Sequence, residues 1–139
     1  VVEDGEMLET EIEAFLHLME QERDKADFLT EYMREHMRMT IRWAFEAGFL
    51  VLAFLEIDGK KAAAKLCFNN QNRLWAYNSG IEKGYEWYSP GWVLLGYLLK
   101  WANEQHYSEF DFMRGDEKYK YRFGAQDRFV MRATVSLPG

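Results

Sequence analysis

A short segment late in the chain gathers the side chains best suited to proton transfer. Residues 110–124 contain two aspartates, Asp111 and Asp116, and two tyrosines, Tyr119 and Tyr121. A carboxylate can accept a proton from a reacting group, and a phenol can donate one. The same residues also have structural uses, because the tyrosines can fill the core and Asp116, which follows a glycine, can cap a helix.

Two cations of the same segment, Arg114 and Lys120, could hold an anionic group of a ligand. They could equally balance the neighbouring aspartates. Asp111 alternates with two phenylalanines, so its side chain could point away from a ligand and pair with Arg114 or Arg122. Residues 110–124 are therefore a candidate functional block in which both uses remain open for each charged residue.

A second candidate site is the start of a predicted helix at Ser89. The serine can accept hydrogen bonds from free helix amides, and Pro90 suits the first helical position. A helix N-terminus carries unpaired N–H groups and about half a positive charge, so it attracts anions. Gly91 would let a ligand approach the backbone closely. The same residues also make an ordinary helix start, so both interpretations remain open.

The composition limits the classes of function that the chain could have. The chain has 139 residues, 48% of them hydrophobic, which suits one domain with one core. The net charge of −6 disfavours nucleic-acid binding, which needs clustered cations, and is compatible with a cationic amine as substrate. Cys67 is the only cysteine and lies in an apolar strand pattern, so we expect a buried, inert thiol. The three histidines are scattered, so we expect no metal site.

The sequence shows no membrane or secretion segment. The longest apolar run, residues 49–55, is too short to span a bilayer, so we expect no membrane partner. The cysteine usage fits a reducing cytoplasm. The chain begins without Met in an acidic stretch, and we expect residues 1–139 to be one domain of a longer protein.

The spacing of apolar residues predicts helices first and a sheet afterwards. The predicted helices span residues 7–23 and 26–47, and the predicted strands span residues 49–57, 60–68 and 73–79. A hairpin turn at Asp58-Gly59 and a turn over residues 69–72 join these strands into an antiparallel meander. The expected elements after the helix from Ser89 are a strand over residues 109–113, a short helix ending at Phe123 with a cap at Gly124, and a final strand over residues 128–135.

This order of elements resembles the GNAT (Gcn5-related N-acetyltransferase) fold without its first and last strands. The segment FDFMRGDEKYKYRFG, residues 110–124, is similar to the signature of the cellulose-biosynthesis-type (CelD-like) acetyltransferase branch. Tyr88-Ser89-Pro90-Gly91, followed by a Leu-rich helix, resembles the same branch. The resemblance covers nearly the whole chain. It implies an α/β (α+β) fold with a mixed, mostly antiparallel sheet flanked by helices.

The resemblance also implies an acyltransferase that moves an acyl group from acetyl-CoA or another acyl-CoA to an amine of a small molecule or sugar, without a metal. In GNAT proteins the third meander strand and the next parallel strand diverge, and the acyl donor lies between them. The residues that would bind the donor are Tyr77, Asn78, Ser79 and Gly80 on the strand, and Ser89, Gly91 and Trp92 at the helix start.

Catalytic roles follow from the same resemblance. Tyr119 corresponds to the position where GNAT enzymes often keep a tyrosine that protonates the departing thiolate, and Tyr121 is the alternative. Asp111 or Asp116 would accept the amine proton, directly or through water. An amide near residues 78–80 would stabilise the oxyanion. The residues expected to contact the substrate are Arg114, Lys120 and Tyr121.

The helix start departs from the family pattern, because residues 86–92 hold one glycine, an acidic residue and a proline in place of a basic, Gly-rich loop. Two alternatives therefore stay open. One is Fem-like aminoacyl transfer from aminoacyl-tRNA, although the acidic balance disfavours tRNA. The other is a catalytically degenerate GNAT half that packs against an active second half or in a homodimer.

Overall fold

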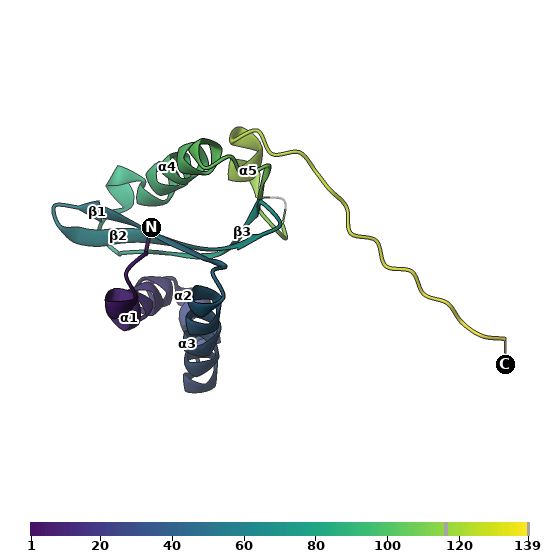
Figure 1. Cartoon of the computed structure of the whole chain (residues 1–139), viewed down its shortest axis with the longest axis horizontal. Helices are drawn as coiled ribbons and strands as arrows, with labels where there is room; N and C mark the ends of the chain where they lie inside the picture. Colours follow the sequence, from purple (N-terminus) through teal and green to yellow (C-terminus); the bar gives the residue numbers. More distant parts are fainter. Residues whose placement is uncertain (116, 139) are drawn as a thin grey trace.

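Four strands form a single sheet, and helices cover both of its faces (Figure 1). The computed structural model describes residues 1–115 and 117–138. The strands are β1 (Leu50–Ile57), β2 (Lys60–Asn70), β3 (Arg73–Ile81) and β4 (Glu109–Asp111). They lie in the order β1-β2-β3-β4, with antiparallel pairing as far as β3 and parallel pairing between β3 and β4. The predicted α+β fold with a mixed, mostly antiparallel sheet is confirmed.

The helices are divided between the two faces of the sheet. One face carries α1 (Leu8–Glu20), α2 (Arg23–Phe28) and α3 (Glu31–Glu46), and the other carries α4 (Pro90–Glu104) and α5 (Lys118–Arg122). Short 3-10 helices, η1 (Gly5–Met7) and η2 (Glu86–Tyr88), precede α1 and α4. Within the described residues, no helix combines the length and the apolar character that crossing a membrane requires.

Tight turns with left-handed residues join the meander. Asp58 and Gly59 have φ values of 51° and 77°, as the predicted hairpin requires. Gln71 and Asn72 form the second turn with φ values of 51° and 59°. This turn is shorter than the predicted residues 69–72, because β2 continues to Asn70.

Strand alternation sends the apolar side chains to two separate cores. Leu52 and Leu66 belong to the cluster beneath α1 and α3. Cys67 and Leu74 belong to the cluster beneath α4. The prediction that Cys67 is buried is confirmed, and burial raises the pKa of its thiol to about 12.

The contact between α1 and β3 depends on Gly80. A Cβ atom at this position would lie 2.5 Å from the Leu18 carbonyl carbon and 2.5 Å from the Met19 nitrogen. Both are backbone atoms of α1, so they cannot rotate away as a side chain could. The absence of a side chain at Gly80 therefore lets the helix hold the last part of β3.

The predicted helix over residues 26–47 is wrong as a single element. The chain leaves α2 after Phe28, buries Leu29 in the core, and starts α3 at Glu31. Thr30 caps the new helix, since its Oγ1 accepts a hydrogen bond from the Met33 amide at 3.3 Å.

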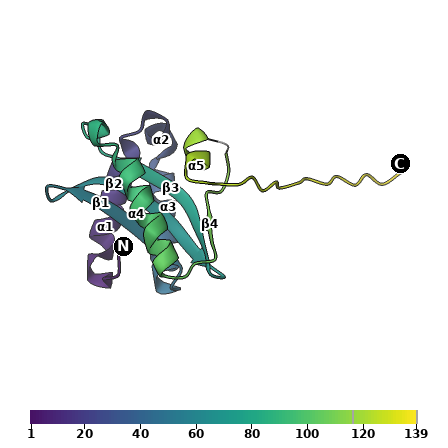
Figure 2. The same ribbon diagram turned by 90° about the horizontal axis from the view of Figure 1, so that it is seen from above.

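The predicted final strand over residues 128–135 is also wrong. This part of the chain is extended but forms no strand, and it runs away from the body of the molecule (Figure 2). The short helix before it is confirmed as α5, and Gly124 follows with a φ of 87°. Alternating apolar residues alone do not make a strand, because a strand also needs a neighbour to satisfy its backbone.

Replacing Gly80 with Ala is expected to lower the free energy of unfolding by about 1–3 kcal/mol, because the added methyl group has to push α1 from the sheet. Urea denaturation followed by circular dichroism measures this change. Gly96→Ala is the matched control, since nothing lies within 4 Å of a Cβ atom there and Ala favours the helix. Equal stability of the two variants would contradict the role given to Gly80.

Candidate functional site

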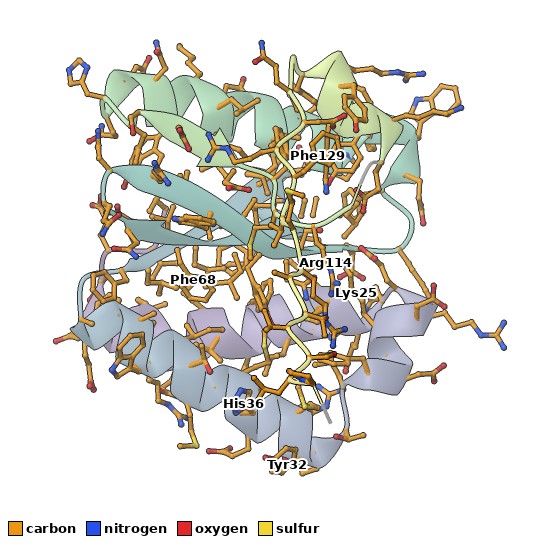
Figure 3. The ribbon with its side chains drawn as sticks, turned by 90° about the vertical axis from the view of Figure 1, so that its right-hand side faces the viewer. Lys25, Tyr32, His36, Phe68, Arg114 and Phe129 are labelled. Carbon is orange, nitrogen blue, oxygen red and sulfur yellow. The ribbon has the colours of Figure 1, made fainter. Side chains whose placement is uncertain are left out.

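The strands β3 and β4 pair only briefly before they separate. Their ladder joins Arg73 to Glu109, Leu74 to Phe110 and Trp75 to Asp111. β3 then continues to Ile81, and no strand of the described chain pairs with its outer edge over residues 76–81. An unpaired strand edge presents free N–H and C=O groups. Figure 3 looks toward this side of the sheet.

A β-bulge lies where the outer edge of β3 becomes free. Ala76 and Asn78 pair with two adjacent residues of β2, so Tyr77 between them has no partner of its own. A bulge bends its strand and strengthens the local twist. The Tyr77 ring is 46% exposed and packs on Phe68 at a centroid distance of 5.7 Å.

Ser79 turns its backbone toward the free edge. Glu82 donates its amide hydrogen to the Ala62 carbonyl at 2.9 Å. Antiparallel pairs alternate between bonded and non-bonded, so Asn78 and Gly80 face β2, whereas the N–H and C=O of Ser79 face outward. Ser79 is therefore the residue of this edge that a bound ligand could meet through its backbone.

Both backbone groups of Ser79 are already bonded to side chains. Lys25 of α2 donates from Nζ to the Ser79 carbonyl oxygen at 2.5 Å, and Asn78 Oδ1 accepts from the Ser79 amide at 2.8 Å. Lys25 Nζ also lies 3.1 Å from Glu22 Oε2. A ligand that accepts from the Ser79 amide therefore has to replace Asn78, and a ligand that donates to the Ser79 carbonyl oxygen has to replace Lys25 or share that oxygen with it.

A second lysine approaches Ser79 from the opposite face of the sheet. Lys65 is the register partner of Ser79, so the two side chains share the face that carries α4. Burial lowers the pKa of Lys65, and repulsion from Lys25 and Lys120 lowers it further. No group within residues 1–115 and 117–138 accepts a hydrogen bond from its amine. The end of β3 thus has a positive character.

The start of α4 differs from the expectation in one respect. Ser89 has a φ of 47°, and its side chain caps no amide. A side-chain cap requires an extended backbone at the capping residue, and a left-handed backbone does not provide it. Instead the Ser89 carbonyl oxygen accepts from the amides of Trp92 at 3.1 Å and Val93 at 3.2 Å.

The first turn of α4 keeps one amide free and packs directly on β3. Pro90 has no N–H, and no described group accepts from the Gly91 amide. A Cβ atom on Gly91 would lie 3.0 Å from Ile81 Cδ1, so the glycine brings the helix start against the end of β3. Trp92 extends from this turn to α5, where its ring lies 5.0 Å from that of Phe123.

Tyr119 lies on α5 and is half-buried. Its ring meets Phe112 edge-on at a centroid distance of 6.3 Å. Burial raises the pKa of the Tyr119 phenol, so the hydroxyl keeps its proton at neutral pH. A protonated phenol is the form that can donate to a leaving group.

Lys120 is buried, with 5% of its surface exposed, and its amine is engaged inside its own loop. It donates to the carbonyl oxygens of Arg114 at 2.7 Å and Gly115 at 3.3 Å, and it pairs with Glu117 at 2.7 Å. Arg114 itself is exposed, on the side of the molecule that Figure 3 shows. Contact of either cation with a substrate stays a prediction.

The remaining candidates have partners close in sequence. Asp111 Oδ1 accepts from the Met113 amide at 2.6 Å, and the Tyr121 hydroxyl donates to Asp127 at 2.6 Å. Among the described side chains Asp111 forms no ion pair with Arg114 or Arg122, but its charge helps to raise the pKa of Arg128, after the hydrogen bond and charge of Glu109. Asp116 lies outside the described residues.

Comparison with known families decides the identity of the fold. Residues 1–121 match the model of the acetyltransferase (GNAT) domain. This chain belongs to the GNAT acetyltransferase family. The matched range includes β3, the start of α4 and Tyr119, so the expectation of a GNAT-type acetyltransferase is confirmed. No curated protein matches the sequence.

Solved structures share the fold of this GNAT domain. A probable acetyltransferase is 10% identical, with a TM-score of 0.66 over 99% of this chain and 96% of the other. AAC(6')-Iy with the bisubstrate analogue CoA-S-monomethyl-acetylneamine is 10% identical, with a TM-score of 0.62 over 91% and 93%. The aminoglycoside acetyltransferase meta-AAC0020, from an uncultured soil metagenomic sample and in complex with sisomicin, is 12% identical, with a TM-score of 0.58 over 92% and 90%.

The GNAT domain thus brings three of the predicted segments together: residues 77–80 of β3, residues 89–92 at the start of α4, and α5, which carries Tyr119. Their individual roles stay predictions. Sequence reasoning missed Lys25 and Lys65. Lys65 interrupts an otherwise apolar stretch of β2, which was a usable signal, whereas nothing in the sequence marked Lys25.

Two cavities of the GNAT domain lie beside β1. Their volumes are ≈ 260 Å³ and ≈ 270 Å³, and Phe54 lines both. In the part of the chain that the structure describes, no cluster of three or more His, Cys, Asp or Glu residues could hold a metal ion.

Replacing Lys65 with Met is expected to raise the melting temperature by a few degrees at neutral pH. Burial lowers the folded-state pKa of this lysine below its ordinary 10.5, so the unfolded chain binds the proton more tightly and the charge destabilises the fold. The penalty falls as pH rises through the lowered pKa, so the gain from Lys65→Met should shrink toward pH 10.5. Melting curves of both proteins across this pH range measure it.

The exposed Lys60, at the first position of β2, provides the control for this measurement. Lys60→Met should leave the melting temperature unchanged at every pH. A loss of stability in Lys65→Met at neutral pH, or a gain that does not depend on pH, would contradict the stated cause.

Proposed function

We propose that this GNAT acetyltransferase transfers an acyl group from acyl-CoA to an amine of a small molecule or sugar. The observation that carries the proposal is the free edge of β3 over residues 76–81, which ends against the first turn of α4. Structures of AAC(6')-Iy with the same fold are complexes with CoA or with a CoA-linked acceptor analogue, which supports this donor.

The donor would use two groups of residues that the structure holds together. Tyr77, Asn78, Ser79 and Gly80 would line the acyl and pantetheine portion, and Ser89, Gly91 and Trp92 would meet the phosphates. The free amide of Gly91 at a helix N-terminus fits an anion. Glu86 is the acidic residue that disfavours phosphate binding at the start of α4. Its Oε2 accepts a hydrogen bond from the Gly84 amide at 2.8 Å, which holds the carboxylate in the preceding loop.

Bound acyl-CoA supplies a thioester carbonyl for attack and a thiolate as leaving group. The outward N–H of Ser79 is suited to stabilise the oxyanion once Asn78 releases it. Tyr119, which burial keeps protonated, would give its proton to the departing thiolate. Asp111 would take the proton that the amine loses, directly or through water, and Asp116 has the same proposed role.

The acceptor is proposed from charge and from the structural neighbours. A net charge of −6 favours the approach of a cationic amine. One neighbour is described in complex with sisomicin and another with an acetylneamine analogue, and both are aminoglycoside acetyltransferases. Arg114, Lys120 and Tyr121 remain the proposed acceptor contacts.

We also propose a branch of the family, a cellular location and a protein partner. Residues 110–124 support placement in the CelD-like branch of the family. The single buried cysteine supports a location in the reducing cytoplasm. A second GNAT-like half or a second copy of the chain remains the proposed protein partner.

Acetyl-CoA is expected to raise the melting temperature of the wild-type chain, since a ligand that binds only the folded state stabilises it. Ser89→Asp should abolish this rise, because a carboxylate at the start of α4 repels the phosphates. Asp tolerates the left-handed backbone and favours a helix N-terminus, so the fold should be retained. Ser89→Asn, of nearly the same shape but neutral, should keep the rise. No rise in the wild type would contradict the donor and direct the search to aminoacyl-tRNA.

Tyr119→Phe is expected to lower the rate of acyl transfer by about 100-fold, because it removes a general acid. Release of CoA thiol from acetyl-CoA in the presence of a panel of amines, aminoglycosides included, measures this rate. Tyr121→Phe tests the alternative acid. Because Tyr121 is a proposed acceptor contact, its loss should raise the KM for the amine and leave the rate at saturating amine largely unchanged. The opposite pattern would move the acid role to Tyr121, and equal rates in all three proteins would exclude a tyrosine acid.

A further inference from the structure

Two lysines from other elements approach Lys65 near the end of β3. Lys25 reaches the strand from α2 (Figure 3), and Lys120 belongs to α5. Repulsion from both of them acts on the Lys65 amine, so both lie within electrostatic reach of it. Positive charges that gather in this way destabilise a fold unless negative charges balance them.

Carboxylates balance the two neighbours of Lys65 but not Lys65 itself. Glu22 Oε2 lies 3.1 Å from Lys25 Nζ, and Glu117 Oε2 lies 2.7 Å from Lys120 Nζ. Within the described chain, no carboxylate lies at ion-pair distance from Lys65, and no group accepts a hydrogen bond from its amine. The positive charge of Lys65 is therefore unpaired in this part of the molecule.

The other acidic groups that act on Lys65 do not neutralise it. Cys67 follows two residues later on β2 and shares its face of the sheet. Burial raises the pKa of the Cys67 thiol to about 12, so the thiol carries no charge at neutral pH. Attraction to Glu22 is weaker than repulsion from either lysine. A bound ligand is thus a suitable source of the missing negative charge.

Lys65 lies beside the place proposed for the acyl group. It is the register partner of Ser79, whose outward N–H would meet the thioester carbonyl. The two residues form a non-bonded pair, in which side chains lie close together. Lys25, which repels Lys65, binds the Ser79 carbonyl oxygen and lies 3.5 Å from its Oγ. The flexible four-carbon stem of Lys65 can therefore bring its amine to a group bonded at Ser79.

A single carboxylate suits this position better than a phosphate. The phosphates of CoA are proposed to bind at the first turn of α4, which lies against Ile81, further along β3 than Ser79. Lys65 is partly buried, and moving a doubly charged group out of water costs more than moving a singly charged one. A carboxylate at the far end of an acyl chain would supply one negative charge next to Ser79.

We propose that Lys65 binds a carboxylate at the far end of the donor's acyl group, so that the enzyme uses a dicarboxylic acyl-CoA such as succinyl-CoA. The inference rests on the proposed acyl-CoA donor and adds the class of its acyl group. An amine that gains its partner only with the substrate accounts for a charge that destabilises the free chain. The chemical step is the one already proposed, because the acyl carboxylate takes no part in forming the C–N bond or breaking the C–S bond.

Isothermal titration calorimetry of the full chain with succinyl-CoA and butyryl-CoA tests the inference, since the two acyl groups have the same number of carbon atoms and differ in charge. The wild type is expected to bind succinyl-CoA at least about tenfold more tightly, because a partly buried amine gains a charged partner. Lys65→Met should bind both with similar affinity and leave the dissociation constant of butyryl-CoA largely unchanged. The exposed control Lys60→Met should keep the wild-type preference.

The results separate a failure of this inference from a failure of the proposed donor. Binding of butyryl-CoA without a preference for succinyl-CoA would overturn the inference and leave the donor intact, whereas binding of neither would overturn both. A preference that persists in Lys65→Met would place the carboxylate elsewhere. Equal weakening of both compounds and of free CoA in Lys65→Met would assign Lys65 to the phosphates and contradict the inference.

A second measurement distinguishes a carboxylate on the donor from one on the acceptor. Transfer from acetyl-CoA to glycine and to ethylamine compares acceptors with and without a carboxylate. The inference predicts that Lys65→Met leaves the ratio of the two rates unchanged. A preference for glycine that Lys65→Met removes would assign the carboxylate to the acceptor and overturn the inference.

Discussion

The free edge of β3 is the feature on which the other parts of the site depend. The strand keeps its partner β4 for three residue pairs, bulges at Tyr77, and continues alone to Ile81. An isolated strand end would be mobile, but helices hold this one from both faces. Gly80 lets the backbone of α1 contact it on one face, and Gly91 lets α4 contact Ile81 on the other. The two glycines thus let helices pack closely on both faces of a strand end whose outer edge pairs with no described strand.

An available backbone group is costly unless something satisfies it, and Lys25 and Asn78 provide the hydrogen bonds at Ser79. An unsatisfied buried group would cost about 1–3 kcal/mol. The carbonyl oxygen of an acyl donor only accepts, so it can bond to the Ser79 amide in place of Asn78. Replacing Lys25 at the Ser79 carbonyl would require an N–H or O–H group of the ligand. Lys25 is tethered to Glu22 and has a second partner when displaced. The outward backbone groups of Ser79 are thus satisfied by two side chains, Lys25 and Asn78, which a ligand could displace.

Sequence alone was sufficient where local chemistry decides the structure. The meander, the Asp58-Gly59 turn, the helix after Pro90 and the cap at Gly124 follow from residue types at fixed positions. The sequence was insufficient to predict local structure where tertiary contacts determine the backbone conformation. The break between α2 and α3 depends on the burial of Leu29, and Ser89 takes a left-handed backbone that its type did not predict. Residues 128–135 had the right alternation for a strand, but their backbone pairs with no strand of the part of the chain that the structure describes.

The candidate site, too, could be predicted from the sequence only in part. The motif order indicated which segments meet, and the structure brings residues 77–80, the start of α4 and α5 to one end of the sheet. The sequence could not show that Lys120 is buried in its own loop, nor that Lys25 reaches Ser79 across 54 positions of the chain. Such contacts depend on how helices pack, which residue spacing does not encode.

Hydrogen exchange of the backbone amides, followed by mass spectrometry with and without acetyl-CoA, tests the central claim most directly. The account predicts slower exchange at Ser79 and in the first turn of α4, at Gly91, when acetyl-CoA is bound. Protection confined to the region around Phe54, where the two cavities adjoin β1, would contradict it. Unchanged exchange throughout the chain at saturating acetyl-CoA would also contradict it.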